Sequence, residues 1–528
     1  MKKLTVVTVV AVLMLASFAI GAKKKGQKGG QYKKNNRELI TRLTAGNLAE
    51  VKKSSEDYIK KNPDDLEYRF ILAICHAQNG DIPNAMAMVK ESVDKGLPFA
   101  RYLAGPHDLL KPLTSSAEFK ALAADKDVEL VHGPLVGSVT DKGASFWVRT
   151  FSEVPVEVSI SRGKDAEPVA TAKSRTEEAR DYTSVLSVDG LKPAIEYRYN
   201  LIINGKRQKE WYKFRTMPVF KKPARFVLAF GGGAGYTPWN ERMWSTIKLH
   251  EPIALMLLGD CVYIDTPKVQ NAQKYCYYRR QSRPEFRALT ASTSVSAIWD
   301  DHDFVTNDAE GGPEIDSPDW KIPVWKTFRN NWNNPAYGGG EKQPGCWFKQ
   351  SIADVDFFFL DGRYYRHREG KTMLGPVQKE WLFEQLKNSK ATFKVICSNV
   401  PITKGVKPGS KDTWDGFPEE REEIYKFLSD NRIDGVFVIA ADRHRSDAWK
   451  NDRPGAYPVY EFQSSRLTNA HTHGIIKGCL FGYNELCSFG RLTFDTTKPD
   501  PEVTYDVINI DNELVESLTL KKSQLTSE

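Results

Sequence analysis

Carboxylate and imidazole side chains follow four short apolar runs of this 528-residue chain. The runs are Ile253–Asp260, Val295–His302, Val355–Arg363 and Gly435–His444, and their ends contain GDCVYID, WDDHDF, DGRYYR and ADRHRSD. Apolar runs of this length, separated by amphipathic stretches, are typical of parallel strands buried on both faces. Because the carboxyl ends of such strands converge on one crevice, we expect the polar side chains to share one rim. Hard oxygen and imidazole donors gathered in this way predict a metal site.

The first of these ends carries Asp260 directly after a glycine, and Tyr263 three residues later. A carboxylate can bridge two metal ions, because each of its oxygens can bind one of them. Carboxylate and phenolate oxygens together suit a hard, highly charged ion such as ferric iron. The alternative is an ordinary turn in which Asp260 caps the next segment.

Residues 299–303 read Trp-Asp-Asp-His-Asp, so three carboxylates surround one imidazole. At the end of a buried strand these like charges would repel one another strongly without a cation, which favours a functional site. We predict that Asp301 is a ligand of a second metal ion. His302 beside it is the candidate general acid.

The last of the four runs ends in Asp442-Arg443-His444. If the strand stays extended, alternation places Asp442 and His444 on one side, where both could bind a metal ion. A pair of this kind also occurs by coincidence, and its position after a buried strand is what favours the metal.

Arg363 follows the third run, in Leu360-Asp361-Gly362-Arg363. A guanidinium beside metal ions suits an oxyanion, because its donors match paired oxygens. The alternative is a structural salt bridge from Arg363 to Asp361 or Asp356.

The glycine-rich segment 231–235 follows the first strand of the same region. Its backbone amides could approach a ligand closely. No Gly-Lys-Ser/Thr follows, which excludes a Walker-type nucleotide site. A tight turn over the sheet is the alternative.

Together these motifs resemble the metallophosphoesterase superfamily and, within it, the alkaline phosphatase D (PhoD-like) family. The resemblance covers about residues 131–500, since that family also carries a β-sandwich before its catalytic domain. It is carried by GDCVYID, IWDDHDF, FFLDGRYYR followed by MLGPVQKEWLFEQL, VICSNVPI and IAADRHRSDAW. WDDHD and the stretch from Leu374 to Leu382 are specific to this family.

The resemblance implies a role for each candidate ligand. Asp260 would be the bridging carboxylate and Tyr263 a ligand of iron. Asp301 would bind the second cation, often calcium, and Asp442 and His444 would complete the site.

Two departures from the family pattern concern the iron. The family usually places Ser-Cys after the first catalytic strand, with the cysteine as an iron ligand, whereas this chain has Gly231-Gly232-Gly233. Ala441 also replaces the glycine usually found before the final aspartate. The iron site therefore has one donor fewer than the family pattern implies, and its ion is in doubt.

The rest of the chain predicts a multidomain protein. Residues 38–125 carry apolar side chains at helical spacing and resemble paired tetratricopeptide-like helices, with a plain helical cap as the alternative. Residues 131–218 alternate in strand fashion and carry the hairpin signal Asn204-Gly205, which predicts an immunoglobulin- or fibronectin-like β-sandwich. Strands and helices then alternate over 224–520, which predicts a layered α/β metallophosphoesterase domain with a large sheet.

The N-terminus has the pattern of a secretory signal peptide over residues 1–22. Lys2 and Lys3 precede an apolar stretch that ends in small residues near Ala19–Ala22. An uncleaved anchor is the alternative, and no other stretch could cross a membrane. We therefore expect a periplasmic or secreted protein.

The positive charge is confined to the same end of the chain. The formal net charge is +8, but residues 1–37 carry nine Lys/Arg and no Asp or Glu, which leaves −1 for the remainder. Residues 23–37 are predicted to be a flexible basic linker. The folded body has no charge pattern that indicates nucleic-acid binding.

The seven cysteines form no CxxC pair and no disulfide framework. Cys479 and Cys487 are the candidate pair for a bridge in an oxidising compartment. Buried free thiols are the alternative, and they are equally expected for Cys75 and Cys397.

These features predict a metal-dependent phosphoesterase that hydrolyses phosphate mono- or diesters with metal-activated water. His302 would protonate the leaving alkoxide, or donate to a phosphoryl oxygen, and Arg363 would balance charge on the phosphoryl oxygens. The alternative is a binding protein in which the helices and the β-sandwich provide surfaces for a protein partner and the catalytic domain is impaired.

Overall fold

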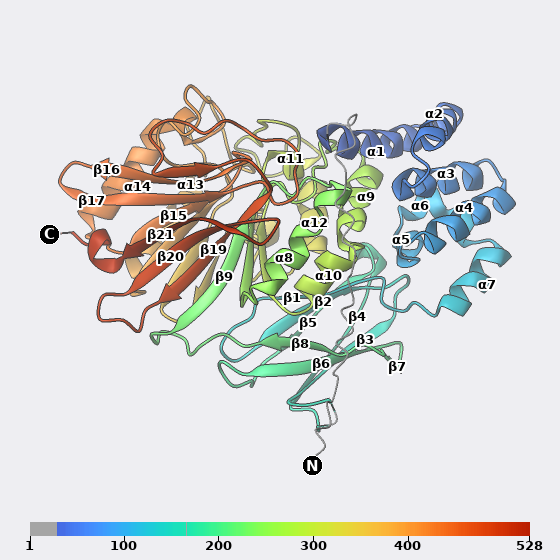
Figure 1. The fold of residues 1–528 in the computed structure, drawn as a ribbon, viewed down its shortest axis with the longest axis horizontal. Coiled ribbons are helices and arrows are strands. Elements are labelled where there is room, and N and C mark those ends of the chain that lie inside the picture. Colours follow the sequence, from blue (N-terminus) through green and yellow to red (C-terminus); the bar gives the residue numbers. More distant parts are fainter. Residues whose placement is uncertain (1–28, 165, 528) are drawn as a thin grey trace, which may run out of the picture.

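The computed structural model describes residues 29–527 apart from residue 165 (Figure 1). The predicted signal peptide and residues 23–28 of the predicted linker lie outside this part. Within the described residues, no helix is both long enough and apolar enough to cross a membrane.

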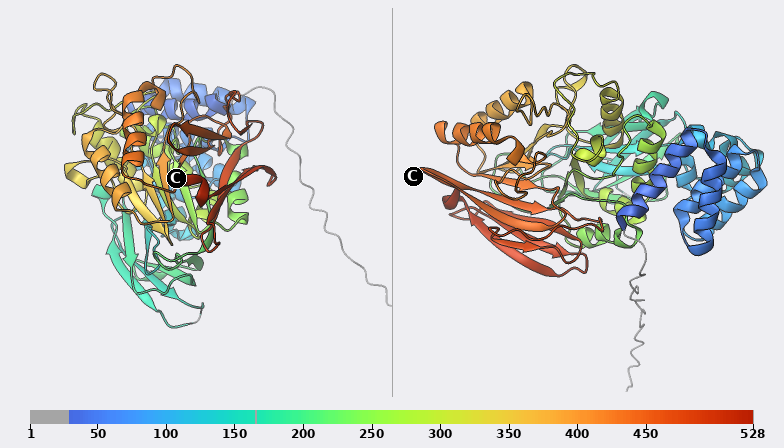
Figure 2. Two further views of the ribbon diagram at one scale, coloured as in Figure 1. Left: turned by 90° about the vertical axis from the view of Figure 1, so that its left-hand side faces the viewer. Right: turned by 90° about the horizontal axis from the view of Figure 1, so that it is seen from above.

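The N-terminal region is helical, as the apolar spacing predicts, and lies at one end of the molecule (Figure 2). Its helices are α1 (Gly29–Thr44), α2 (Leu48–Lys61), α3 (Leu66–Gln78), α4 (Ile82–Asp94), α5 (Ala100–Ala104), α6 (His107–Thr114) and α7 (Ala117–Lys126). Side-chain caps begin several of them. The Asp65 carboxylate accepts from the N–H of Tyr68, and that of Asp81 from the N–H of Asn84.

The predicted linker is wrong for residues 29–37, because these residues begin α1. Arg37, Leu39 and Ile40 are all buried in the described structure. A polar, basic composition predicts a solvated chain, but here α1 packs against α9 (Gln270–Gln281), and that tertiary contact stabilises the helix.

A nine-stranded sheet joins the two β-containing regions. Its order is β21-β20-β19-β9-β10-β11-β1-β2-β5. The strands from the N-terminal β region are β1 (His132–Gly137), β2 (Ala144–Arg149) and β5 (Thr183–Val188). The others are β9 (Arg225–Gly231), β10 (Ala254–Leu258), β11 (Ser294–Ile298), β19 (Ser488–Asp495), β20 (Glu502–Asn509) and β21 (Leu514–Lys521).

Residues 131–218 contribute strands to two sheets, and the immunoglobulin- or fibronectin-like form of the predicted β-sandwich stays a prediction. Strand β1 pairs in parallel with β11, so three strands of this region extend the sheet that contains β10 and β11. A five-stranded sheet forms the rest of the region, from β3 (Pro155–Ser161), β4 (Ala170–Arg175), β6 (Glu196–Ile203), β7 (Lys206–Arg207) and β8 (Tyr212–Arg215). Alternation along a strand indicates one buried face, but it does not identify the neighbouring strand.

The C-terminal region contains a second sheet of seven strands, where the sequence predicts one large sheet. Its order is β12-β13-β14-β15-β17-β16-β18. The strands are β12 (Phe348–Ile352), β13 (Val355–Phe359), β14 (Phe393–Ser398), β15 (Val436–Ala440), β16 (Ser446–Arg453), β17 (Ala456–Ser464) and β18 (Phe481–Tyr483). The apolar runs that precede the candidate ligands thus divide between the sheets, with β10 and β11 in one and β13 and β15 in the other.

Aromatic side chains join the two sheets face to face. The ring of Phe494 on β19 lies 5.9 Å from that of Phe357 on β13, 5.9 Å from that of Phe393 on β14 and 6.2 Å from that of Phe437 on β15. Helices accompany this pair of sheets, namely α8 (Met243–Leu249), α9, α10 (Pro284–Thr290), α11 (Asp301–Phe304), α12 (Lys321–Asn331), α13 (Pro376–Asn388) and α14 (Pro418–Asp430) (Figure 1).

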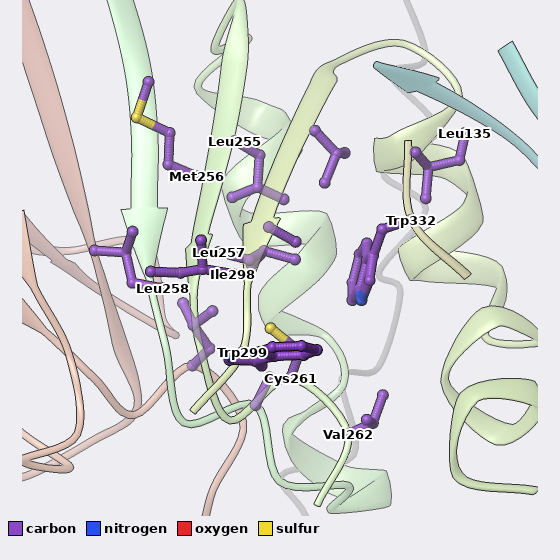
Figure 3. Close-up of a cluster of buried hydrophobic side chains, with 14 of the residues drawn as sticks. Leu135, Leu255, Met256, Leu257, Leu258, Cys261, Val262, Ile298, Trp299 and Trp332 are labelled. Atoms are coloured by element: carbon purple, nitrogen blue, oxygen red, sulfur yellow. The ribbon is translucent and has the colours of Figure 1, made fainter. Parts of the chain in front are cut away.

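Strands β10 and β11 hold the first two candidate ligand segments at one edge. They pair in parallel from Ala254 opposite Ser294 to Leu258 opposite Ile298. Their side chains belong to the buried apolar cluster that also contains Trp299 and Cys261 (Figure 3). Because Leu258 and Ile298 are paired at the ends of the two strands, residues 259–260 and 299–301 follow at the same edge of the sheet.

All seven cysteines lie within the described residues and are free thiols. The candidate bridge between Cys479 and Cys487 is therefore absent from the structure. Cys75 and Cys397 are fully buried, in agreement with the alternative of buried thiols.

The buried Glu461 on β17 makes stability depend on pH. Its carboxylate accepts from the N–H groups of Thr403 (2.6 Å) and Ile402 (3.0 Å), and burial raises its pKa from the usual 4.5 to about 7. The folded protein therefore holds this proton more tightly than the unfolded chain does. Its contribution to stability is present below about pH 4.5 and is lost as the pH rises through about 7.

We expect Glu461→Gln, which cannot ionise, to match the wild-type free energy of unfolding at about pH 4. At about pH 8 it should exceed the wild-type value by roughly 3 kcal/mol. Urea unfolding at both pH values measures this difference, and Glu380→Gln at an exposed position is the control. An equal difference at the two pH values would contradict the prediction.

Candidate metal centre

The structure brings Asp260, Asp301 and His302 together. One ligand atom from each lies within 4.8 Å of the others. These residues follow β10 and β11, so the parallel register of the two strands is what places them side by side. The prediction that these two strand ends meet at one site is in agreement with this geometry.

The loop after β10 bends sharply through left-handed backbone conformations. Gly259 has a φ of 102°, Asp260 and Tyr263 of 55°, and Asp265 of 51°. Such angles are costly for residues with a side chain, so surrounding contacts must hold the loop in place. Asp303 supplies some of them, because its carboxylate accepts from the N–H groups of residues 261 (2.9 Å) and 262 (2.8 Å).

The three carboxylates of residues 299–303 have three different environments. Asp303 holds the loop after β10, whereas Asp300 accepts from Arg363 (2.6 Å) and from the Asn399 amide (2.6 Å). Asp301 alone belongs to the cluster with Asp260 and His302. The structure therefore separates the candidate ligand from its two structural neighbours.

Asp260 has the environment of a metal ligand. Its side chain is buried, and Oδ1 has no hydrogen-bond partner. Burial, together with the charges of Asp301, Asp300 and Asp303, raises the pKa of Asp260 well above its usual range. A cation in contact with this oxygen would satisfy it and offset the repulsion. The donor set present therefore fits a metal ion.

Tyr263 and His444 both contact Asn469, a residue that sequence reasoning missed. The Asn469 amide donates to the Tyr263 hydroxyl (2.8 Å) and lies 3.4 Å from His444 Nδ1. Burial and the Asp260 carboxylate raise the pKa of the Tyr263 hydroxyl well above its usual range. Asn469 was missed because an isolated asparagine in a loop carries no sequence pattern that indicates a site.

The sequence analysis expected strand alternation to place Asp442 and His444 on one side. The chain is not extended at these residues, so alternation does not apply to them. The chain leaves β15 at Ala440 and turns, with a φ of 68° at Asp442 and 47° at His444. Burial and the charges of Asp412 and Asp301 raise the pKa of Asp442 above its usual range. The turn thus brings Asp442 to the Asp301 side of the site, while His444 contacts Asn469 beside Tyr263.

Asp265, a second residue that sequence reasoning missed, supports His302 together with Tyr263. Asp265 accepts a hydrogen bond from His302 Nδ1, and the Tyr263 ring stacks on the imidazole with centroids 4.7 Å apart. Burial lowers the pKa of His302, but Asp260, Asp265 and Asp301 raise it to about 10. The hydrogen bond to Asp265 leaves Nε2 as the nitrogen available to a ligand.

Residues 228–477 match the family model described as PhoD-like phosphatase, and residues 127–219 match a domain of unknown function (DUF7800). Over 110 residues, which are 20% of this chain, the sequence is 33% identical to alkaline phosphatase D of Bacillus subtilis (strain 168). That alignment spans 18% of the relative's length. The chain carries a PhoD-like phosphatase domain.

Solved structures show the same fold. The structure of PhoD matches with a TM-score of 0.64 at 17% identity, over 74% of this chain and 90% of that chain. Purple acid phosphatase PPD1 from yellow lupin (Lupinus luteus) seeds matches with a TM-score of 0.55 at 12% identity, over 74% of this chain and 75% of that chain.

Arg363 lies beneath the PhoD-like site and not at its surface. The side chain is fully buried, and its guanidinium donates to Asp300 (2.6 Å) and Asp412 (2.6 Å). The expected direct contact with an oxyanion does not fit this arrangement. A structural ion pair, the alternative, describes Arg363 better, although its partners are not Asp361 or Asp356.

A further acidic group adjoins Asp301 in the PhoD-like domain. Ligand atoms of Asp301, Asp308 and Asp412 lie within 4.8 Å of one another. Asp412 already pairs with Arg363 and Arg366, and these charges lower the pKa of its carboxyl against the effect of burial. Asp412 is therefore a counter-ion for the two arginines, which weakens the case for a cation there.

The glycines that depart from the family pattern are required by close packing. A Cβ on Gly232 would lie 2.6 Å from the Ala441 Cβ and 2.9 Å from the Gly259 carbonyl oxygen. A Cβ on Gly233, whose φ is 64°, would lie 3.1 Å from His444 Nδ1. The Ala441 methyl group therefore occupies the space that a side chain at position 232 would need. Neither glycine offers a side-chain donor to a metal ion.

Proposed function

We propose that this protein is a metal-dependent phosphoesterase that hydrolyses phosphate mono- or diesters. The observation that carries the proposal is the buried, unpartnered Asp260 oxygen beside Asp301 and His302 within a PhoD-like phosphatase domain. A fold alone does not determine a reaction, but these carboxylate and imidazole donors suit a cation, and they lie within the residues that match a phosphatase family.

The residues would hold two metal ions in two half-sites that share Asp260. Tyr263 and His444 would complete one half-site, and Asp301 and Asp442 the other. We propose iron and calcium for these positions, with a different ion at the first if the missing cysteine lowers its affinity for iron. When bound, the ions supply Lewis-acid chemistry, since they withdraw charge from phosphoryl oxygens and acidify water.

His302 is the residue that would transfer a proton. Asp265 accepts the Nδ1 proton, which orients the ring and leaves Nε2 to protonate the leaving oxygen of the ester. The Tyr263 ring, stacked on the imidazole, limits its rotation. Arg363 would act indirectly, because its ion pairs hold Asp300 and Asp412 in place next to the candidate ligands.

The N-terminal pattern supports export, so we propose a periplasmic or secreted location. The basic and apolar residues 1–22 carry this proposal. The helical region α1–α7 would then provide a tetratricopeptide-like surface for a protein partner.

Elemental analysis of the purified protein, combined with turnover of nitrophenyl phosphate mono- and diesters, tests the proposed activity. We expect bound metal and turnover that increases when calcium or iron is added to a chelator-treated sample. No metal and no turnover under any supplementation would overturn the proposal and favour the alternative of a binding protein.

A further inference from the structure

The N-terminal helix α1 places a single guanidinium against the loop that carries the candidate site. Arg37 Nη1 donates to the Tyr263 carbonyl oxygen (2.6 Å) and to Asp265 Oδ2 (2.5 Å). The Arg37 side chain is only 6% exposed. Arg37 is 226 positions before Tyr263 and 228 positions before Asp265 in the chain. These two hydrogen bonds therefore join distant parts of the sequence next to the candidate site.

Both acceptors of Arg37 belong to residues that touch His302. Asp265 receives Arg37 on one carboxylate oxygen and His302 Nδ1 on the other. Tyr263 receives Arg37 on its carbonyl oxygen and stacks its ring on the imidazole. Arg37 therefore fixes the hydrogen-bonding partner and the stacking partner of one side chain at the same time.

Tertiary packing holds Arg37 in this position. Ile40 and Leu43, on the same helix, are buried in the apolar core. The Tyr275 hydroxyl on α9 donates to Glu67 on α3 (2.7 Å), which links the same helical region to the catalytic domain through a second buried contact. The position of Arg37 thus depends on docking of the helical region onto α9, and not on the chemistry of one surface pair.

We propose that Arg37 is a positioning residue for His302, so that docking of the N-terminal helical region is required for full turnover. This inference rests on the proposed phosphoesterase activity. Burial matters to it, because a charged hydrogen bond shielded from water orients its partner far more strongly than an exposed one. Outer-shell partners of residues in metal sites typically change metal affinity or activity 10–100-fold when they are removed, and we expect an effect of this order for Arg37.

The kinetic test compares Arg37→Ala and Arg37→Lys with wild type in the full-length chain. Arg42→Ala is the matched control, because Arg42 lies on the same helix and pairs with Glu50 in an exposed position (2.8 Å). We expect Arg37→Ala to lower kcat for phenyl phosphate roughly 10–100-fold. KM and metal content should be unchanged, and Arg37→Lys should recover part of the loss.

The leaving group separates positioning of His302 from a general loss of structure. Nitrophenyl phosphate needs less protonation of its more acidic leaving oxygen, so its kcat should fall much less than that of phenyl phosphate in Arg37→Ala. An equal loss for both esters, or an equal loss in Arg42→Ala, would overturn the inference.

A second measurement is independent of turnover. Proton NMR should show a low-field signal from the His302 Nδ1 proton, identified by its absence in His302→Gln. We expect this signal to shift or broaden in Arg37→Ala and to remain in Arg42→Ala. An unchanged signal in Arg37→Ala would overturn the inference. If the wild type hydrolyses no ester, the proposed activity fails, while this signal still decides whether Arg37 orients His302.

Discussion

Asp301→Ala should lower turnover of phosphate esters by at least about 10³-fold while the protein remains folded. Asp301 is the only carboxylate of residues 299–303 that joins the cluster with Asp260 and His302. Its removal takes away a candidate ligand of the second metal ion, and with it the charge that would bind that ion. We therefore also expect the metal content of the purified variant to fall.

The same variant should unfold at nearly the wild-type temperature in the metal-free state. Asp301 accepts from the N–H groups of His302 (2.8 Å) and Asp308 (2.7 Å), and loss of these bonds costs about 1–3 kcal/mol. Relief of repulsion between Asp301 and Asp260 offsets part of this cost.

Kinetics, elemental analysis and thermal unfolding of Asp301→Ala together check this prediction. Asp452→Ala is the control, because the Asp452 side chain is 79% exposed and pairs only at the surface with Lys450. Near-normal turnover by Asp301→Ala with metal still bound would show that Asp301 has no part in the site.

His302→Gln should lower kcat by roughly 10²–10⁴-fold for esters with a weakly acidic leaving group. Glutamine can still donate a hydrogen bond towards Asp265, but it cannot transfer a proton to the leaving oxygen. The loss should be smaller for nitrophenyl phosphate than for phenyl phosphate, since nitrophenolate leaves more readily without protonation. Metal content should stay near the wild-type value, because the role proposed for His302 is proton transfer.

A series of aryl phosphates measures this effect directly, as the slope of log kcat against the pKa of the leaving group. The slope should be steeper in His302→Gln than in the wild type. A loss of equal size along the series, accompanied by loss of metal, would instead identify His302 as a metal ligand.

Several elements of the fold follow from the sequence because their signals are local. The apolar run at 393–398 is strand β14, and the amphipathic stretch that ends at Asn388 is α13. The candidate ligands Asp260 and Asp301 could be assigned for the same reason. A carboxylate directly after a buried strand lies at a sheet edge wherever that strand is placed.

Other elements depend on partners distant in the chain. Alternation within residues 131–218 indicates strands, yet only the pairing of Gly137 with Val295 shows that β1, whose residues are all buried, extends the sheet of β10 and β11. The roles of Asp442 and His444 depend on the turn after β15, where both residues adopt a positive φ. Such angles are costly for residues with a side chain, and tertiary contacts such as the hydrogen bond from the His444 N–H to the Ser465 hydroxyl (3.3 Å) hold the turn.

The sequence by itself determined which side chains could bind a cation, since residue type and position after a strand are local properties. Only the tertiary structure decided which of these side chains lie at the candidate site and which residues support them. It buried Arg363 beneath Asp300, placed Asn469 between Tyr263 and His444, and brought Arg37 from a supposed linker to Asp265. The physical reason is that a buried ion pair or hydrogen bond selects its partner by distance in space, which chain separation does not encode.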